Sequence, residues 1–172
     1  MKKTIIAILL ASVALLAACN NDSKEPQVEE QDGIGFNVED ETIEEAANVP
    51  EDEKIAILSA FDTYISTFNE KDLEAYMSMI AEDTESFDKE EERAYVAEAF
   101  ELYDLIREPS DVTIVKYSEE EAQVFANLQN KLKQLSSGLE TKESSRQVTV
   151  FVKEQDEWKV KSVHSIGENP TK

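Results

Sequence analysis

The chain has one histidine and one cysteine, and these are its strongest candidates for acid–base or thiol chemistry. His164 could act as a base or a pH sensor, since histidine is the side chain best suited to both roles. The alternative is a structural, partly buried histidine. One histidine and one thiol are too few ligands for a zinc site. Cys19 has no second cysteine with which to form a disulfide or a redox pair.

Carboxylates are abundant, but their arrangement does not indicate a dedicated metal site. They gather in two runs, Glu90–Glu92 and Glu119–Glu121, at the expected start of a helix and at a turn. Such runs are usually solvated faces that attract cations only weakly. No P-loop, GxGxxG, HExxH or EF-hand spacing occurs. The sequence therefore predicts neither a resident metal nor a cofactor.

The position of Cys19 indicates export. Two lysines follow Met1, and the fifteen residues from Thr4 to Ala18 carry no charge. This is the order of a secretory signal, and the run is shorter than the roughly 20 residues that a membrane-spanning helix needs. The segment is therefore a targeting signal that is removed.

The residues before Cys19 resemble the lipobox of bacterial lipoprotein precursors, a leucine and two small residues ahead of a cysteine: Leu16-Ala17-Ala18-Cys19. The resemblance implies cleavage after residue 18 and a diacylglycerol on the sulfur of Cys19, with palmitate a typical acyl chain. Two acyl chains suffice for stable anchoring. The alternative is an ordinary signal peptide with a cysteine nearby. We expect a lipid-anchored protein on the extracytoplasmic face, with a Gram-positive plasma membrane favoured.

Charge excludes one class of partner. The whole chain has a net charge of -21, and removal of the signal leaves 15 basic and 38 acidic residues, or -23. Such a surface repels nucleic acids and anionic lipid headgroups. We expect no nucleic acid to bind and contact with the membrane only through the lipid.

Residues 19–50 are predicted to form an acidic, disordered tether. From Asn20 to Pro50 there are ten acidic residues, one lysine and one aromatic residue. This composition cannot bury enough apolar surface to fold by itself. A flexible coil of this length reaches about 30 Å, and charge repulsion extends it. An acidic arm that docks a basic partner is the alternative.

The helical part follows Pro50. Three acidic residues favour a first turn, and apolar residues then recur at spacings of three and four. Asp72 is placed to cap a second helix, and Asp88 a third. The predicted buried residues of the first helix are Ile55, Ile57, Leu58, Phe61, Tyr64, Ile65 and Phe68. Those of the second are Leu73, Tyr76, Met77 and Ile80, and those of the third are Tyr95, Val96, Ala99 and Phe100.

The rest of the domain reads as antiparallel strands. Residues 111–117 are β-branched, residues 122–129 alternate, and residues 148–153 alternate again. Turns are expected at 118–121 and 155–157, with a loose connection near 136–138. Pro109 should break or bend any earlier strand. The last strand is predicted to place these residues on one face: Trp158, Val160, Ser162, His164 and Ile166.

Three helices followed by strands predict one α+β domain over residues 51–168, with a short tail at 169–172. The order of elements resembles the nuclear transport factor 2-like superfamily, in which helices pack on a curved antiparallel sheet to form a cone. The segments that carry the resemblance are Ala60–Tyr64, Phe68–Tyr76 and Glu157–Val160. The superfamily includes polyketide cyclase-like and ketosteroid isomerase-like proteins, so the resemblance specifies the fold better than the activity.

The same resemblance suggests a pocket. It places Tyr64 at the position of the isomerases' oxyanion-stabilising tyrosine and Asp88 at that of their catalytic aspartate. Their second oxyanion donor falls near Thr149 or Val150, neither of which is acidic. Structural alternatives are a packed tyrosine and an N-cap aspartate.

Three functions remain open. The favoured one is a non-catalytic domain that binds a small apolar ligand or an envelope partner, with Tyr64, Asp88 and His164 as candidate pocket residues. The second is an isomerase-, cyclase- or dehydratase-like enzyme that uses Asp88 as base, Tyr64 as oxyanion donor and His164 as alternative base. The third is a spacer or a self-associating module that forms a homodimer through its sheet.

Overall fold

The structure is a computed structural model that describes residues 43–84 and 88–167. The predicted signal, the predicted lipid acceptor Cys19, most of the predicted tether and residues 168–172, which include the predicted tail at 169–172, lie outside the described residues. Within the described ranges, no helix combines the length and the apolar character needed to cross a bilayer.

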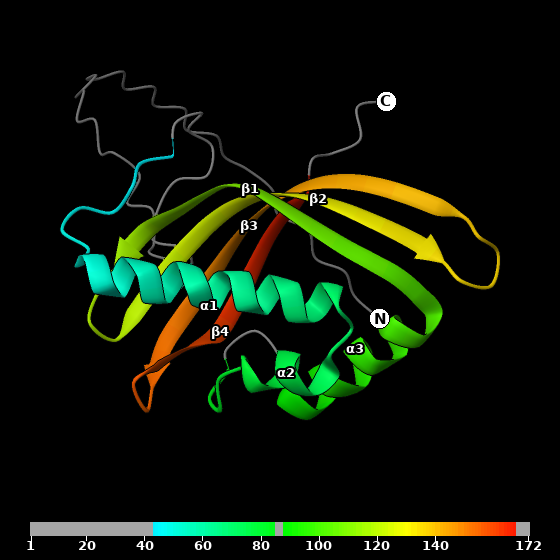
Figure 1. The fold of residues 1–172 in the computed structure, drawn as a ribbon, viewed down its shortest axis with the longest axis horizontal. Coiled ribbons are helices and arrows are strands. Elements are labelled where there is room, and N and C mark those ends of the chain that lie inside the picture. The colour runs from blue at the N-terminus through cyan, green and yellow to red at the C-terminus, as the bar shows by residue number, and fades with distance from the viewer. Residues whose placement is uncertain (1–42, 85–87, 168–172) are drawn as a thin grey trace, which may run out of the picture. The chain divides into compact units, whose positions relative to one another are not determined.

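Three helices precede four strands, as predicted. The helices are α1 (Glu51–Asn69), α2 (Leu73–Ser78) and α3 (Lys89–Leu102). The strands are β1 (Tyr103–Tyr117), β2 (Glu121–Gln134), β3 (Glu140–Glu154) and β4 (Glu157–Gly167). The strands form one antiparallel sheet in the order β1-β2-β3-β4 (Figure 1). The α+β fold class is therefore confirmed.

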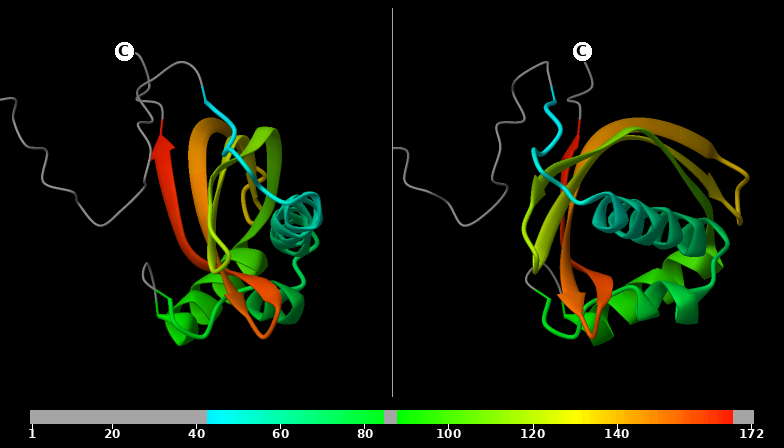
Figure 2. Two further views of the ribbon diagram at one scale, coloured as in Figure 1. Left: turned by 90° about the vertical axis from the view of Figure 1, so that its left-hand side faces the viewer. Right: turned by 60° about the vertical axis from the view of Figure 1, so that its left-hand side comes forward.

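The sheet curls around α1, which lies along its concave side, while α2 and α3 close one end of the curl (Figure 2). This arrangement creates the core. The buried side chains come from all three helices and from the concave side of the sheet, and they include Ile57, Phe61, Tyr64, Phe68, Tyr76, Val96, Val124, Leu128, Phe151, Trp158 and Val160.

The helix starts follow from local sequence. Asp72 accepts a hydrogen bond from the backbone N–H of Ala75 (3.0 Å). Asp88 accepts from the N–H groups of Glu90 (2.9 Å) and Glu91 (3.0 Å). Both aspartates therefore satisfy otherwise unpaired amides of the first turn, and the predicted caps are confirmed.

Two predicted core residues are wrong. Ile55 is 62% exposed and Tyr95 is 70% exposed. On each of the two helices, apolar residues cover more of the circumference than one buried face can hold. Ile55 and Tyr95 lie outside the face that packs against the rest of the domain. On α1 the buried side contains Ile57 and Phe61.

Pro109 does not break β1, so of the two predicted effects, a break or a bend, the break is wrong. It pairs with Leu128 in the β1–β2 register. Two residues earlier, the backbone N–H and C=O of Arg107 bond to Asn69 and not to β2. In an antiparallel strand, residues two apart direct their backbone N–H and C=O groups to the same side. The side of Pro109 that lacks an N–H therefore faces away from β2. An edge strand such as β1 tolerates proline on its unpaired side. A register shift follows at Ser110–Thr113, where Asp111 has φ of 54°.

The central hairpin is longer than predicted. β2 continues to Gln134 and β3 begins at Glu140, so the polar stretch 140–147 is strand and not a loose connection. Gly138, at φ of 73°, provides the left-handed residue of the tight turn between them. The turn at Gln155 and Asp156 also has two positive φ values, as a two-residue hairpin of type I′ requires.

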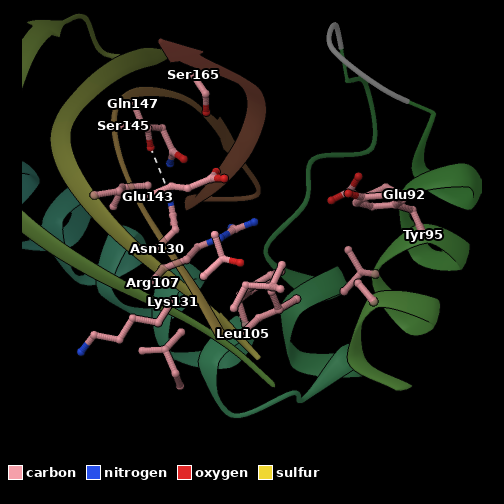
Figure 3. A pocket seen from close by; sticks show the side chains of 17 residues that line it. Glu92, Tyr95, Leu105, Arg107, Asn130, Lys131, Glu143, Ser145, Gln147 and Ser165 are labelled. Atoms are coloured by element: carbon pink, nitrogen blue, oxygen red, sulfur yellow. Dashed lines mark hydrogen bonds between the residues drawn. The ribbon is translucent and has the colours of Figure 1, made fainter. Parts of the chain in front are cut away.

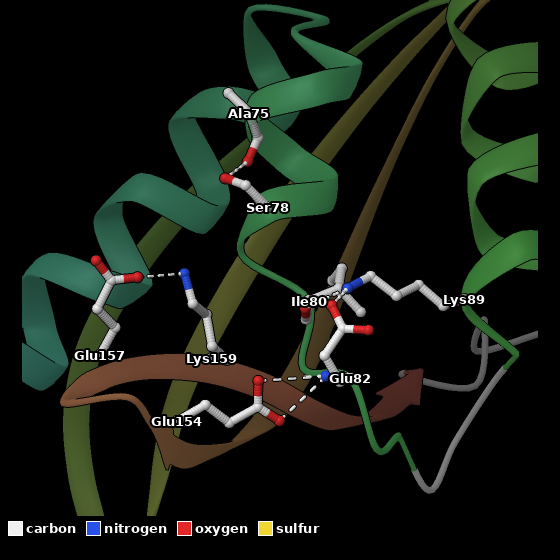
Figure 4. Close-up of polar contacts among 8 residues, drawn as sticks. All are labelled: Ala75, Ser78, Ile80, Glu82, Lys89, Glu154, Glu157 and Lys159. Carbon is white, nitrogen blue, oxygen red and sulfur yellow. Dashed lines mark hydrogen bonds and ion pairs between the residues drawn. The ribbon is translucent and has the colours of Figure 1, made fainter.

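The segment between α2 and α3 is tied to the β3–β4 hairpin (Figure 4). Val160 donates its backbone N–H to the C=O of Met79 (2.7 Å) and accepts from Ala81 (2.9 Å). Lys89, the first residue of α3, donates to the C=O of Ile80 (3.1 Å) and pairs with Glu82 (2.6 Å). These bonds fix where α3 begins relative to the sheet.

The chain also contacts the domain before Glu51. The backbone N–H of Ala46 donates to the C=O of Ile114 (2.7 Å), and Ala46 and Val49 pack against the core. Residues 43–50, the end of the predicted tether, therefore lie against the folded part.

Candidate functional site

A cavity of about 340 Å³ lies between α3 and the sheet (Figure 3). Its sheet residues belong to 105–107 of β1, 128–132 of β2 and 141–147 of β3, with Ser165 of β4. Its apolar lining consists mainly of Phe68, Val96, Ala99, Leu105, Leu128 and Leu132. Its polar lining includes Glu92, Arg107, Asn130, Glu143, Ser145 and Gln147. The size lies at the lower end of the range for small-molecule sites.

Strand alternation places these residues. Leu105 and Arg107 are two apart on β1, and Leu128, Asn130 and Leu132 follow the same spacing on β2. Successive side chains of a strand point to opposite faces, so these positions share the concave face. One lining residue, Arg107, could have been found from the sequence alone. Arg107 occupies a core-facing position of a strand, where a permanent charge is unexpected.

Arg107 is held against aromatic rings. Its Cζ lies 3.5 Å from the centre of the Phe68 ring and 5.9 Å from that of Tyr64. Its Nη1 donates to the hydroxyl of Tyr64 (3.3 Å). The guanidinium is therefore positioned by a cation–π contact and one hydrogen bond, which leaves donors of its planar fork for another partner.

The backbone of Arg107 is also fixed. Asn69, the last residue of α1, donates through Nδ2 to the C=O of Arg107 (2.9 Å) and accepts through Oδ1 from its N–H (2.8 Å). The side chain of Asn69 thus acts like a neighbouring strand at the edge of β1, and it links the position of the guanidinium to α1.

A buried polar chain lies behind Arg107. Tyr76 donates its hydroxyl to Glu92 (2.8 Å), and the rings of Tyr64 and Tyr76 lie 5.4 Å apart. Burial raises the pKa of Tyr76 well above 10, and the nearby Tyr64 and Glu92 add to the shift. Tyr76 therefore remains a neutral hydrogen-bond donor, and one oxygen of the Glu92 carboxylate is occupied.

Two opposing effects act on the pKa of the Arg107 guanidinium. Burial lowers the pKa of the guanidinium, and its interactions with Tyr64, Tyr76 and Glu92 raise it by more, so the net shift is upward. Arg107 is cationic in any case, because a guanidinium does not lose its proton in proteins. Within residues 43–84 and 88–167, the structure records no ion pair between Arg107 and a carboxylate.

The three residues predicted as pocket residues do not line this cavity. Tyr64 lies next to it and is connected to it through Arg107. Asp88 is exposed and accepts from two backbone amides as the N-cap of α3. His164 is partly buried, with Nε2 at 3.3 Å from Oγ of Ser162. The structure thus brings Tyr64, but neither Asp88 nor His164, to Arg107.

The position of His164 follows from a bulge in β4. Val160 pairs with Phe151 and Ser162 pairs with Val150, so Lys161 is an extra residue. A bulge of one residue exchanges the two faces of a strand. Beyond it, Ser165 and not His164 lines the cavity. The predicted shared face of Trp158 and His164 is therefore wrong.

No group of three or more histidine, cysteine, aspartate or glutamate side chains within the described ranges is arranged to hold a metal ion. The cavity's own lining supplies one guanidinium, the ammonium of Lys131, carboxylates, amides and hydroxyls. This set can bind and orient a small molecule through hydrogen bonds and charge.

The curled sheet and the three helices define the fold, an α+β cone like that of nuclear transport factor 2-like proteins. Residues 59–168 match the family model described as the C-terminal domain of the anti-sigma-I factor RsgI9, and the chain belongs to this family. No curated protein matches the chain.

Solved structures of the same fold support the class. A ketosteroid isomerase-like protein from Erwinia carotovora is 19% identical, with a TM-score of 0.60 over 70% of this chain and 100% of that one. A protein assigned as a dehydratase of the NTF2-like family from Streptomyces avermitilis is 14% identical, with a TM-score of 0.59 over 70% and 99%. A protein assigned as an aromatic ring hydroxylase from Novosphingobium aromaticivorans is 13% identical, with a TM-score of 0.65 over 71% and 93%. These likenesses show the fold alone.

Proposed function

We propose that this chain is an exported, lipid-anchored protein whose cone domain binds a small, largely apolar ligand in the Arg107 cavity without transforming it. The observation that carries the proposal is Arg107 itself. A permanent charge is held on the Phe68 ring, inside a cavity with both apolar and polar walls, and part of its donor fork is unused. A binding site has this construction, with apolar walls and a few fixed polar groups.

Binding is favoured over catalysis because the residues expected to react lie elsewhere. An isomerase-type mechanism needs a base and an oxyanion donor within reach of one bound molecule. Asp88 caps α3 at the surface, and His164 contacts Ser162 outside the cavity lining.

Export and anchoring rest on the N-terminal sequence. The proposal is supported by the N-terminal residues, which resemble those of a lipoprotein precursor: Lys2 and Lys3, the uncharged run that follows and the motif Leu16–Cys19. In this proposal the lipid on Cys19 holds the chain at the extracytoplasmic face of a Gram-positive plasma membrane, and the acidic segment connects the anchor to the domain.

Thermal-shift measurements test the binding role. The chain carrying Cys19→Ser, which has no lipid acceptor, is screened against small apolar molecules. A ligand at 100 times its Kd stabilises the folded state by about 2.7 kcal/mol. We expect at least one molecule to raise Tm, and Ala99→Trp, which fills the cavity, to abolish that rise. Ala94→Trp makes the same change at an exposed position of α3 and should bind normally.

Two results would overturn the binding role. One is that no molecule raises Tm, which would favour an envelope protein as the partner. The other is an equal rise in both tryptophan variants, which would place binding outside the cavity.

Mass spectrometry tests the anchor. The N-terminal peptide of the mature chain should begin at Cys19 and carry a diacylglycerol, and the Cys19→Ser chain should leave the membrane fraction. Unmodified Cys19 in a membrane-bound wild-type chain would refute lipid anchoring.

A further inference from the structure

Arg107 forms no ion pair within the described residues. It is stacked on Phe68 and donates to Tyr64, and no carboxylate there pairs with it directly. Glu92 is near enough to help raise its pKa but accepts its hydrogen bond from Tyr76, so donors of the guanidinium remain for an anion. A guanidinium presents parallel N–H donors whose spacing matches the two oxygens of a carboxylate.

The other charges of the lining restrict what can bind. Lys131 pairs with Glu108, so it does not compete for an anion in the cavity. Glu92 accepts from Tyr76, and Figure 3 shows the carboxylate of Glu143 directed toward the cavity. With these two carboxylates in the lining and a chain charge of -21, a ligand with several negative charges is disfavoured. One negative charge can be compensated by Arg107.

The remainder of the lining favours an apolar body. Val96, Ala99 and Leu105 approach from α3 and β1, and Leu128 and Leu132 approach from β2. A hydrocarbon chain placed there is removed from water, which favours its binding.

We propose that the cavity takes a monocarboxylate with an apolar body, whose carboxylate binds the Arg107 guanidinium and whose body lies against Val96, Leu105 and Leu132. This inference rests on the proposed binding function and assigns its ligand class. The carboxylate is held by Arg107, the apolar walls exclude water from the body, and Glu92 and Glu143 reject a second negative charge.

Calorimetric titration with three probes of one chain length tests the assignment: octanoate, octanamide and octylamine. Hydrogen bonds to charged groups contribute roughly twice as much as neutral ones, so octanoate should bind at least about tenfold tighter than octanamide. Arg107→Gln should weaken octanoate about tenfold or more and leave octanamide unchanged. Arg93→Gln is the matched control, because Arg93 pairs with Glu74 at the surface and should not alter octanoate binding.

A second measurement needs no variant and so does not depend on the folding of Arg107→Gln. The carboxyl carbon of ¹³C-labelled octanoate is followed by NMR as pH falls. Beside Arg107, the pKa of the bound carboxyl should lie below that of free octanoate. An unchanged or raised bound pKa would refute the contact with Arg107.

The outcomes separate this inference from the proposed function. If octanamide binds as tightly as octanoate, the carboxylate assignment is wrong but the binding role stands. Tighter binding of octylamine would also refute it and would assign the head group to Glu92 or Glu143. If none of the probes binds and no other small molecule raises Tm, the proposed function itself fails.

Discussion

The guanidinium carbon of Arg107 lies 3.5 Å from the ring centre of Phe68. The two residues come from β1 and α1, so a single contact joins the edge strand, the central helix and the floor of the cavity. The aromatic face offers the cation a weakly negative surface without neutralising it. The charge is therefore stabilised and still available to a ligand.

A double-mutant cycle measures this contact. Arg107→Met and Phe68→Leu, alone and combined, should give a coupling free energy of about 0.5–2 kcal/mol in urea unfolding. The cycle of Arg107 with the exposed Tyr95→Phe should give a value near zero. Equal coupling in the two cycles would show that the contact with Phe68 contributes nothing specific.

The side chain of Asn69 should matter more than an ordinary surface amide. Asn69→Ala removes two hydrogen bonds to the backbone of Arg107, and the loss should cost about 1–3 kcal/mol of unfolding free energy. Because these bonds place Arg107, ligand affinity should fall as well. Asn127→Ala, which breaks an exposed bond to Asp111, should cost less than about 1 kcal/mol and leave affinity intact. The prediction fails if both variants behave alike.

The raised pKa of Tyr76 predicts a loss of stability in alkali. The folded state keeps the phenol neutral, whereas the unfolded chain releases the proton near pH 10. Stability from this group is therefore complete below pH 10 and falls as pH rises further, by about 1.4 kcal/mol at one unit above.

Urea unfolding at pH 8 and pH 11 checks this effect. Tyr76→Phe should lose its Glu92 hydrogen bond at pH 8 but should show a smaller drop between the two pH values than the wild type. Tyr95→Phe, at a 70% exposed position, should follow the wild type. An equal drop in all three proteins would refute the assignment to Tyr76.

Glu53 should anchor the start of α1 to the β3–β4 hairpin. It accepts from Nε1 of Trp158 (2.9 Å) and pairs with Lys153. Glu53→Ala leaves the indole N–H of a residue that is 4% exposed without its acceptor, which should cost about 1–3 kcal/mol. Trp158 is the only tryptophan, so its emission reports the change directly. Asp62→Ala, on the exposed side of α1, should change stability by no more than about 0.5 kcal/mol, and an equal effect would contradict the anchoring role.

Local signals in the sequence were sufficient for the helix starts and for the fold class. Asp72 and Asp88 act as caps because the N-cap interaction involves only neighbouring residues. The buried sides of the helices were harder to predict. Ile55 and Ile57 are equally apolar, and the choice between them depends on where the sheet lies against α1.

Features of the sheet that depend on contacts between distant segments could not be predicted from the local sequence. Residues 140–147 are polar and yet form strand, because their stability comes from pairing with β2 and not from their own burial. The bulge at Lys161 has no local signature and moves His164 out of the predicted face. Arg107 was not predicted, although its spacing of two from Leu105 on β1 was a usable signal, and its partners Phe68 and Tyr64 are distant in sequence.

A crystal structure with 8-bromooctanoate tests the central claim most directly. The anomalous signal of bromine locates the apolar end without reliance on weak density for the chain. We predict the bromine between α3 and β2, near Val96 and Leu132, with both carboxylate oxygens within hydrogen-bond distance of Arg107. Bromine outside the cavity, or a carboxylate directed to solvent with Arg107 uncontacted, would contradict the account.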